Sequence, residues 1–275
     1  MAEAATVRSA IAAAARRFAF SATPRLDAEL LMAHALGIAR EAMLLARMDA
    51  PTPPGFAALA DRRAAQEPVA YIVGHRAFWT IDIAVGPGVL VPRADSETLI
   101  EAAVAHFGHR SPACILDLGT GPGTLLLAAL DQWPEATGLG IDTSAVALAM
   151  AEANARTLGS AGRARFRSGD WATGIAERFD LILANPPYIG TVEPLPAEVR
   201  AHEPAAALFA GADGLDAYRV IAPALPPLLA PGGIACVEIG ATQAPAVRAL
   251  LEAQGLATGL HRDLGGRDRC VTATP

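Results

Sequence analysis

Cysteine is scarce in this chain, and its placement excludes two classes of small scaffold. The 275 residues contain three cysteines, Cys114, Cys236 and Cys270, which lie far apart and never form a CxxC pair. A disulfide scaffold and a zinc site are therefore not expected. Cys114 and Cys236 fall in apolar, strand-like runs, so we expect both to be buried as small hydrophobic residues. The six histidines show no ligand-like spacing, and we assign no metal site.

Aromatic and charged residues are also few. Aromatics make up 5% and charged residues 18%, whereas hydrophobic residues reach 52%. The core must therefore be built from Ala, Leu, Val and Ile, as in packed α/β proteins, and a disordered chain is excluded. The net charge of −6 argues against non-specific nucleic-acid binding, although it does not exclude a local basic patch.

Long apolar runs are absent as well. The run at 10–15 is short and is followed by Arg16 and Arg17, which does not fit a secretory signal. The longest uncharged stretch, 220–237, contains four prolines and two adjacent glycines, so one membrane-spanning helix is not expected. We expect a cytoplasmic protein without a membrane segment.

Helical spacing dominates residues 1–75, which we interpret as a small helical domain. Thr23 is placed to cap a helix, Pro24 suits its first position and Gly37 suits its end. An apolar stripe is expected from Leu26, Leu30 and Leu31. A second helix is expected over 56–66, with Arg62 and Arg63 on its solvated face.

The hydrophobic period then changes from helical to alternating. Residues 78–85 alternate, a GPG turn follows at 86–88, and VLVP comes next, which predicts a β-hairpin linker over 76–92. Helices and short apolar strands then alternate through 93–275, which predicts an α/β domain with a mostly parallel sheet covered on both faces. We expect strands at 114–119, 137–142, 163–169, 179–185 and 233–240, and helices at 96–107, after 123, at 144–158, after 185 and at 244–254. The tail at 269–275 is a candidate antiparallel edge strand.

A glycine-rich segment, DLGTGPGT at 117–124, lies between an apolar strand and a helix. Gly119, Gly121 and Gly123 lack Cβ atoms where the chain must turn, so a ligand can approach the backbone and the helix N-terminus. A dinucleotide fingerprint would place its third glycine at Thr124. The observed spacing suits an adenosyl group better than a pyrophosphate, and a purely structural turn is the alternative.

Asp142 strengthens the nucleoside interpretation. It lies 142 − 119 = 23 residues beyond the first glycine of the loop, at the end of the next expected strand. A carboxylate there can accept hydrogen bonds from ribose hydroxyls. The alternative is an N-cap for the helix that follows.

A second motif, NPPY at 185–188, follows another expected strand. Pro186 and Pro187 lack N–H donors and hold the turn extended, so the turn presents acceptors. The Asn185 side-chain oxygen and the Pro186 carbonyl can each accept one hydrogen of a planar NH₂ group, while Tyr188 offers a ring for stacking. Such bonds localise electron density on a delocalised nitrogen and aim it at an electrophile about 3–3.5 Å away, without a strong base. An ordinary proline turn is the alternative.

Together, the glycine loop, Asp142 and NPPY resemble a class I S-adenosylmethionine-dependent methyltransferase acting on an amide or an exocyclic amine. Further segments resemble the release factor glutamine methyltransferases, the HemK or PrmC family, over essentially the whole chain. These segments are EPVAYIVGHRAFW at 67–79, VPRADSETLIE at 91–101, DGLDAYRVI at 213–221, VEIG at 237–240 and DLGGRDRCV at 263–271.

The resemblance implies a Rossmann-like domain at 93–275 with a seven-stranded, mostly parallel sheet whose last strand is antiparallel. It implies methyl transfer from S-adenosylmethionine, leaving S-adenosylhomocysteine, to the side-chain amide nitrogen (N5) of glutamine in the Gly-Gly-Gln motif of peptide chain release factors. The N-terminal domain would grip the release factor, and we expect a monomer that binds neither a membrane nor nucleic acid directly. The residues that would hold the glutamine are Asn185, Pro186, Pro187 and Tyr188. The cofactor-binding residues would be Gly119, Thr120, Gly121, Pro122, Gly123, Asp142, Trp171 and Asn185.

Several points stay open at this stage. Pro122 departs from the family's usual loop and removes one amide donor, from which we expect a small effect on affinity. Trp171 would flank the adenine, or is a core aromatic at a strand end. Arg93, Ser96 and Glu97 either begin a helix or close over the cofactor. The long segment 189–204, with Glu193, Glu198 and Glu203, is a candidate lid.

Four other functions compete with this interpretation. One is glutamine methylation of a ribosomal protein, and another is N6-adenine methylation of DNA or RNA, which the net charge disfavours. A nicotinamide oxidoreductase is opposed by Thr124, and a non-catalytic adenosyl-binding module by the intact NPPY motif.

Overall fold

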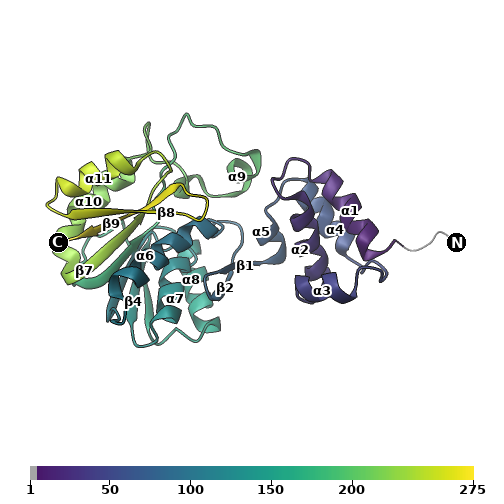
Figure 1. The fold of residues 1–275 in the computed structure, drawn as a ribbon, viewed down its shortest axis with the longest axis horizontal. Coiled ribbons are helices and arrows are strands. Elements are labelled where there is room, and N and C mark those ends of the chain that lie inside the picture. Colours follow the sequence, from purple (N-terminus) through teal and green to yellow (C-terminus); the bar gives the residue numbers. More distant parts are fainter. Residues whose placement is uncertain (1–4) are drawn as a thin grey trace. The chain divides into compact units, whose positions relative to one another are not determined.

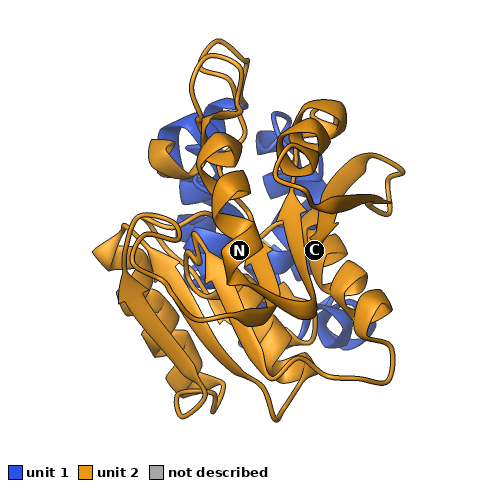
Figure 2. Cartoon of the chain, turned by 90° about the vertical axis from the view of Figure 1, so that its left-hand side faces the viewer, with its two compact units in different colours: residues 1–75, 196–202 blue, residues 76–195, 203–275 orange. Residues whose placement is uncertain are grey.

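The computed structural model describes residues 5–275, which divide into two compact units (Figure 2). One unit comprises residues 1–75 together with 196–202, and the other comprises 76–195 and 203–275. The sequence prediction included 196–202 in the domain at 93–275. The structure instead groups this segment with the N-terminal helices.

The first unit is helical and has its own apolar core. Its core includes Phe18, Leu31, Met32 and Met43, all fully buried. Pro24 occupies the first turn of α2 and Gly37 ends it in the left-handed conformation (φ +64°), as expected. Leu26 is wrong as a member of the buried stripe, because its side chain is exposed. The helices are α1 (Val7–Arg17), α2 (Pro24–Leu36), α3 (Arg40–Ala46), α4 (Phe56–Ala64), α5 (Val69–Val73) and α9 (Ala197–His202).

Arg63 corrects the prediction of a solvated arginine pair on α4. Arg62 is exposed and pairs with Glu67, but only 3% of Arg63 is exposed. Arg63 donates to the buried Asp27 carboxylate at 2.9 Å and to Glu198 of α9 at 2.6 Å. The guanidinium also lies 4.8 Å from the ring centroid of Phe20. Arg63 therefore joins three segments of the first unit.

The expected hairpin is present within 76–92, but its turn lies elsewhere. Strands β1 (His75–Phe78) and β2 (Ile81–Ala84) form a two-stranded sheet whose connection is Trp79 and Thr80. Trp79 takes a positive φ of 53°, which the turn requires. The predicted turn at 86–88 is present, since the Val89 N–H donates to the Gly86 carbonyl at 3.4 Å, but the strand expected after it was wrong, because residues 85–93 form no strand.

The second unit is built on a seven-stranded sheet in the order β5-β4-β3-β6-β7-β9-β8. Neighbouring strands from β5 to β7 pair in parallel, and β9 pairs antiparallel with β7 and β8. The mostly parallel sheet with an antiparallel last strand is confirmed. The strands are β3 (Cys114–Leu118), β4 (Thr137–Asp142), β5 (Ala164–Ser168), β6 (Phe179–Ala184), β7 (Leu229–Glu238), β8 (Ala257–Arg262) and β9 (Asp268–Thr274).

Two details of this sheet differ from the prediction. Strand β8 was missed because ATGLHR lacks an apolar alternation and none of its residues is buried. It occupies the edge, so β9 lies inside the sheet and the tail is not an edge strand. Cys236 is buried as expected, but Cys114, the first residue of β3, is exposed.

Helices cover both faces of the sheet (Figure 1). Tyr218, Ile221 and Leu225 of α10 pack with Leu116 and Leu118 of β3 in one core cluster. On the other face, an added Cβ at Gly138 of β4 would meet Leu126 of α7 at 2.3 Å, so this glycine lets helix and sheet approach closely. These helices are α6 (Glu97–Phe107), α7 (Thr124–Gln132), α8 (Ala145–Thr157), α10 (Asp216–Leu228) and α11 (Ala244–Glu252), with short 3₁₀ turns η1 (Ala94–Ser96) and η2 (Ala205–Ala207).

Within residues 5–275, the helices are too short or too polar to span a membrane. The proline-rich stretch divides between α10 and β7.

The buried ion pair of Arg63 yields a stability prediction. Arg63→Met leaves the Asp27 carboxylate buried without its cation, and we expect a loss of about 3–5 kcal/mol in the free energy of unfolding of the first unit. Arg62→Met, which removes the more exposed ion pair of the adjacent residue with Glu67, is the matched control and is expected to cost under about 1 kcal/mol. Denaturant unfolding followed by circular dichroism measures both, and equal shifts would contradict the account.

Candidate active site

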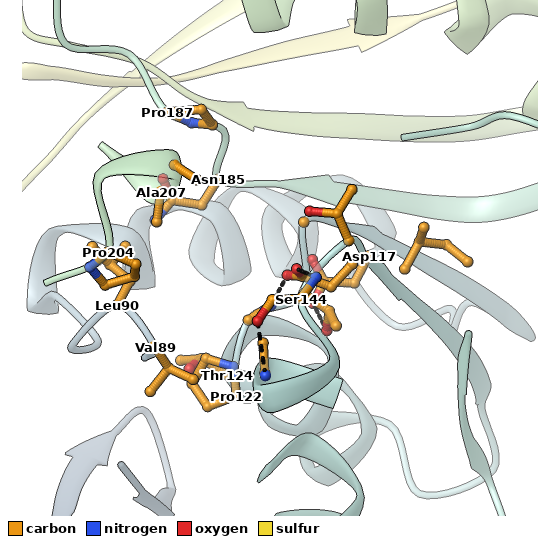
Figure 3. Close-up of a pocket in the computed structure, with 18 of the residues that line it drawn as sticks. Val89, Leu90, Asp117, Pro122, Thr124, Ser144, Asn185, Pro187, Pro204 and Ala207 are labelled. Carbon is orange, nitrogen blue, oxygen red and sulfur yellow. Dashed lines mark hydrogen bonds between the residues drawn. The ribbon is translucent and has the colours of Figure 1, made fainter. Parts of the chain in front are cut away.

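A cavity of about 410 Å³ lies where β3, β4 and β6 end. It is lined by the glycine loop after β3, by Asp142 at the end of β4, and by Asn185 and Pro187 after β6 (Figure 3). Segments 88–96 and 204–207 complete its walls. Residues from both predicted motifs therefore line one cavity, although Gly123, Pro186 and Tyr188 are not among the residues that line it.

The glycine loop is held by backbone hydrogen bonds and by a buried amide. The N–H groups of Gly119 and Thr120 both donate to the Ile141 carbonyl at 2.9 Å. Gly119 has φ +73°, a conformation that favours glycine, and a Cβ there would lie 3.3 Å from the Trp171 ring, which would have to shift slightly to admit it. The Pro122 carbonyl accepts from the Asn154 side chain at 2.9 Å. The loop is therefore anchored to both β4 and α8.

Asp142 braces the same loop. Its carboxylate accepts from the Gly121 N–H at 2.9 Å and from the Ser144 N–H at 2.8 Å. The N-cap of α8 is Ser144, whose hydroxyl accepts from the Ala147 N–H. The alternative role of Asp142 as the N-cap was therefore wrong, and the carboxylate lines the cavity instead.

Asp117 is a cavity residue to which the sequence reasoning gave no role. Only 1% of it is exposed, and one carboxylate oxygen accepts from Thr120 Oγ1 at 2.6 Å and from the Leu126 N–H at 3.2 Å. The other oxygen, Oδ1, is buried and has no hydrogen-bond partner among the described residues. Burial raises the pKa of Asp117 to about 7, although the Thr120 hydrogen bond opposes this. An unsatisfied buried acceptor is costly, which is typical of a functional site.

The NPPY turn divides between cavity wall and core. Asn185 and Pro187 line the cavity, whereas Pro186 is buried and Tyr188 packs against the core beneath the sheet. Burial raises the pKa of Tyr188 to about 12, and the nearby Glu238 adds to this. The Tyr188 carbonyl accepts from Gln243 Nε2 at 2.9 Å. Asn185 Nδ2 donates to Ser96 Oγ at 3.1 Å.

Ser96 and its neighbours fall into two groups. Arg93 and Ser96 line the cavity, whereas Glu97 accepts from the Trp79 N–H at 2.9 Å and supports the two-stranded sheet.

Glu203, at the end of the candidate lid, is buried between Arg93 and the Val91 N–H. Glu193 accepts from the Gly190 N–H at 2.8 Å, which closes a tight local turn.

Trp171 occupies a position between its two expected roles. It lines the cavity, and it also packs partly against the core cluster of the sheet. Its φ of 48° is unusual for a large side chain and places the ring over Gly119. Over the described part of the chain, no cluster of histidine, cysteine and carboxylate residues is suited to a metal ion.

Comparison with known proteins finds matches to both units of the chain. A family model described as the PrmC N-terminal domain matches residues 9–74, and one described as the methyltransferase small domain matches 94–195. A release factor glutamine methyltransferase of Rhodospirillum rubrum is 48% identical over 91% of this chain and 78% of its own. One of Moorella thermoacetica is 41% identical over 98% of both chains. The fold resembles that of a T. thermophilus 16S rRNA N2 G1207 methyltransferase solved with AdoMet and guanosine, at 19% identity and a TM-score of 0.51 over 72% of this chain and 49% of that one.

This similarity extends over nearly the whole chain and therefore spans both units. The chain belongs to the release factor glutamine methyltransferase family.

Proposed function

We propose that this protein transfers a methyl group from S-adenosylmethionine to the side-chain amide nitrogen of the glutamine in the Gly-Gly-Gln motif of release factors. The observation that carries the proposal is the orientation of the Asn185 side-chain amide. Its Nδ2 group is engaged by Ser96, so its carbonyl oxygen is left to accept a hydrogen from a planar NH₂ group at the cavity. The names of the relatives support the release factor as the source of that group.

The residues around the cavity fit S-adenosylmethionine. The molecule is cationic, and the buried Oδ1 of Asp117 offers it an acceptor that the protein leaves unsatisfied. The glycine loop and Asp142 would hold the ribose side, and Trp171 would flank the adenine. When bound, the sulfonium supplies an electrophilic methyl group.

The protein's own task is to prepare a weak nucleophile. The lone pair of an amide nitrogen is delocalised into its carbonyl, and hydrogen bonds from both N–H atoms to Asn185 and to the Pro186 carbonyl would localise it. Positioning of the nitrogen in line with the methyl group supplies several kcal/mol of the barrier. Methyl transfer would join the nitrogen to the methyl carbon and release S-adenosylhomocysteine as a neutral thioether, and the nitrogen would then lose one proton to water to give the neutral methylamide.

The helical unit is the proposed recognition element for the release factor. It matches the PrmC N-terminal domain model and includes α9, from the segment that follows NPPY. The segment 189–204 would then contribute to both substrate recognition and the cavity wall, through Glu198 in one unit and Glu203 in the other. We also propose that the protein acts as a monomer in the cytoplasm, where release factors function.

Transfer of label from S-adenosylmethionine tests the proposed function. Purified release factor is compared with the same factor carrying Gln→Ala in its Gly-Gly-Gln motif, with a ribosomal protein fraction and with duplex DNA. We expect label on the intact release factor alone. Label on DNA or ribosomal protein would overturn the substrate, and cofactor binding without transfer to any of them would overturn the activity.

Asn185→Ala tests the role of the NPPY turn. Removal of the acceptor is expected to lower kcat by about two orders of magnitude, as for loss of one preorganised hydrogen bond in a transition state. The Kd for S-adenosylmethionine, measured by calorimetry, should stay close to the wild-type value. Normal kcat would exclude Asn185 from holding the glutamine.

Asp142→Ala tests the cofactor side. Loss of the carboxylate removes its bonds to the ribose and to the Gly121 N–H, and we expect the Kd for S-adenosylmethionine to rise about tenfold or more. Asp268→Ala removes a surface partner of Arg262 in β8 and serves as the control. If calorimetry gave the same Kd for both variants, Asp142 would not belong to the site.

The raised pKa of Asp117 predicts that the affinity for S-adenosylmethionine depends on pH. Its pKa of about 7 means that the carboxyl is mostly ionised at pH 8 and mostly protonated at pH 6. Because the cationic ligand favours the ionised form, we expect its Kd to rise about tenfold from pH 8 to pH 6. Asp117→Asn should bind more weakly at pH 8 and lose this dependence, whereas an unchanged pH dependence would assign it to another group.

A further inference from the structure

Residues from three sequence segments lie close to one another beside the NPPY turn. Ser96 ends the 3₁₀ turn before α6, Glu238 is the last residue of β7, and Arg269 lies in β9. They belong to the PRADSE, VEIG and DLGGRDR segments of the sequence. The structure thus places residues from distant parts of the chain next to the NPPY turn.

A chain of polar contacts leads from the cavity into the core through these residues. Asn185 Nδ2 donates to Ser96 Oγ at 3.1 Å, and the Ser96 side chain lies beside the Glu238 carboxyl, where it lowers the pKa of that carboxyl. Ser96 and Glu238 are 3% and 1% exposed. The second carboxylate oxygen of Glu238, Oε2, is buried and has no hydrogen-bond partner in the part of the chain that is described. The backbone carbonyl of Glu238 is fixed by the Tyr218 hydroxyl at 2.9 Å.

The direction of these hydrogen bonds follows from proton counting. A serine hydroxyl has one proton, and an ionised carboxylate can only accept. The Ser96 proton therefore points to Glu238, and the Ser96 oxygen is left to accept from Asn185. The Asn185 amide must then turn its NH₂ group toward Ser96, which leaves its carbonyl oxygen for a ligand.

We propose that Ser96 and Glu238 are positioning residues that set the orientation of the Asn185 amide, so that Asn185 accepts from the glutamine N–H and does not oppose it with its own NH₂ group. The inference rests on the proposed function and deepens the account of the same site. It assigns Ser96, for which sequence reasoning weighed a helix start against closure over the cofactor, to a third role.

Because Glu238 can gain or lose a proton, the orientation of the Asn185 amide depends on pH. Burial raises the pKa of Glu238 to about 7, and the negative charge of Asp95 also raises this pKa. The Ser96 side chain and the positive charges of Arg269 and Arg93 lower it. The other titratable groups that act on Glu238 or are acted on by it are Tyr188, Tyr218 and Cys270. A protonated Glu238 can donate to Ser96, which releases the Ser96 proton toward Asn185 and favours the opposite amide orientation. The active orientation therefore belongs to the ionised carboxyl.

Substitution of Ser96 is the first arm of the test. We expect Ser96→Ala to lower kcat about tenfold, while the KM for release factor and the Kd for S-adenosylmethionine change less than about twofold. Ser96→Thr keeps the hydroxyl and should recover most of the rate. Ser160→Ala makes the same change at another buried serine outside the cavity and is the matched control. Equal rates for Ser96→Ala and Ser160→Ala would overturn the proposal.

The pH profile is the second arm and does not depend on the Ser96 variants. With both substrates saturating, kcat of the wild type should rise between pH 6 and pH 8 with a midpoint near 7. We expect Glu238→Gln to lose this rise and Asp117→Asn to keep it, because Asp117 acts on cofactor affinity. An unchanged rise in Glu238→Gln would contradict the role of Glu238. Failure of the wild type itself to methylate the release factor would contradict the proposed function instead.

Discussion

The parallel pairing of β3 with β4 on one side and β6 on the other is the constraint on which the site depends. In the register of these strands, Leu118 lies opposite Ile141 and Ala184. The residues that follow each strand therefore emerge at one edge of the sheet: the glycine loop, Asp142 and Asn185. Ligands in open α/β sheets bind at the carboxyl ends of the strands for this reason.

Two buried carboxyl groups near the cavity reduce the folding stability of the second unit. Asp117 and Glu238 each keep one oxygen buried without a partner among residues 5–275, and burial raises the pKa of both to about 7. A carboxyl in an apolar environment costs free energy unless it is paired. Arg63 provides the contrast, because its buried charge is matched by Asp27 and Glu198. Of the unmatched groups, Asp117 lies in the cavity wall and Glu238 lies next to Ser96 of that wall, whereas the matched Arg63 lies in the helical unit.

Local patterns were sufficient to predict most of the sheet and the position of both motifs. Strands β3, β4 and β6 are short apolar runs, and glycine or proline marks the turn after β3 and after β6, so each of these elements can be recognised from a few consecutive residues. The failures involve residues whose partners are distant in sequence. Arg63 is 36 residues from Asp27 and 135 from Glu198, and Asn185 is 89 from Ser96. Strand β8 lacks buried residues, and its pairing to β9 was not visible in its sequence.

The central claim is that the protein presents an acceptor to a glutamine side-chain amide and directs a methyl group to its nitrogen. The most direct measurement is tandem mass spectrometry of release factor after reaction with the protein and S-adenosylmethionine, with fragmentation across the Gly-Gly-Gln peptide. The account predicts one added methyl group on the glutamine side chain. A methyl group on another residue, or on the peptide backbone, would contradict it.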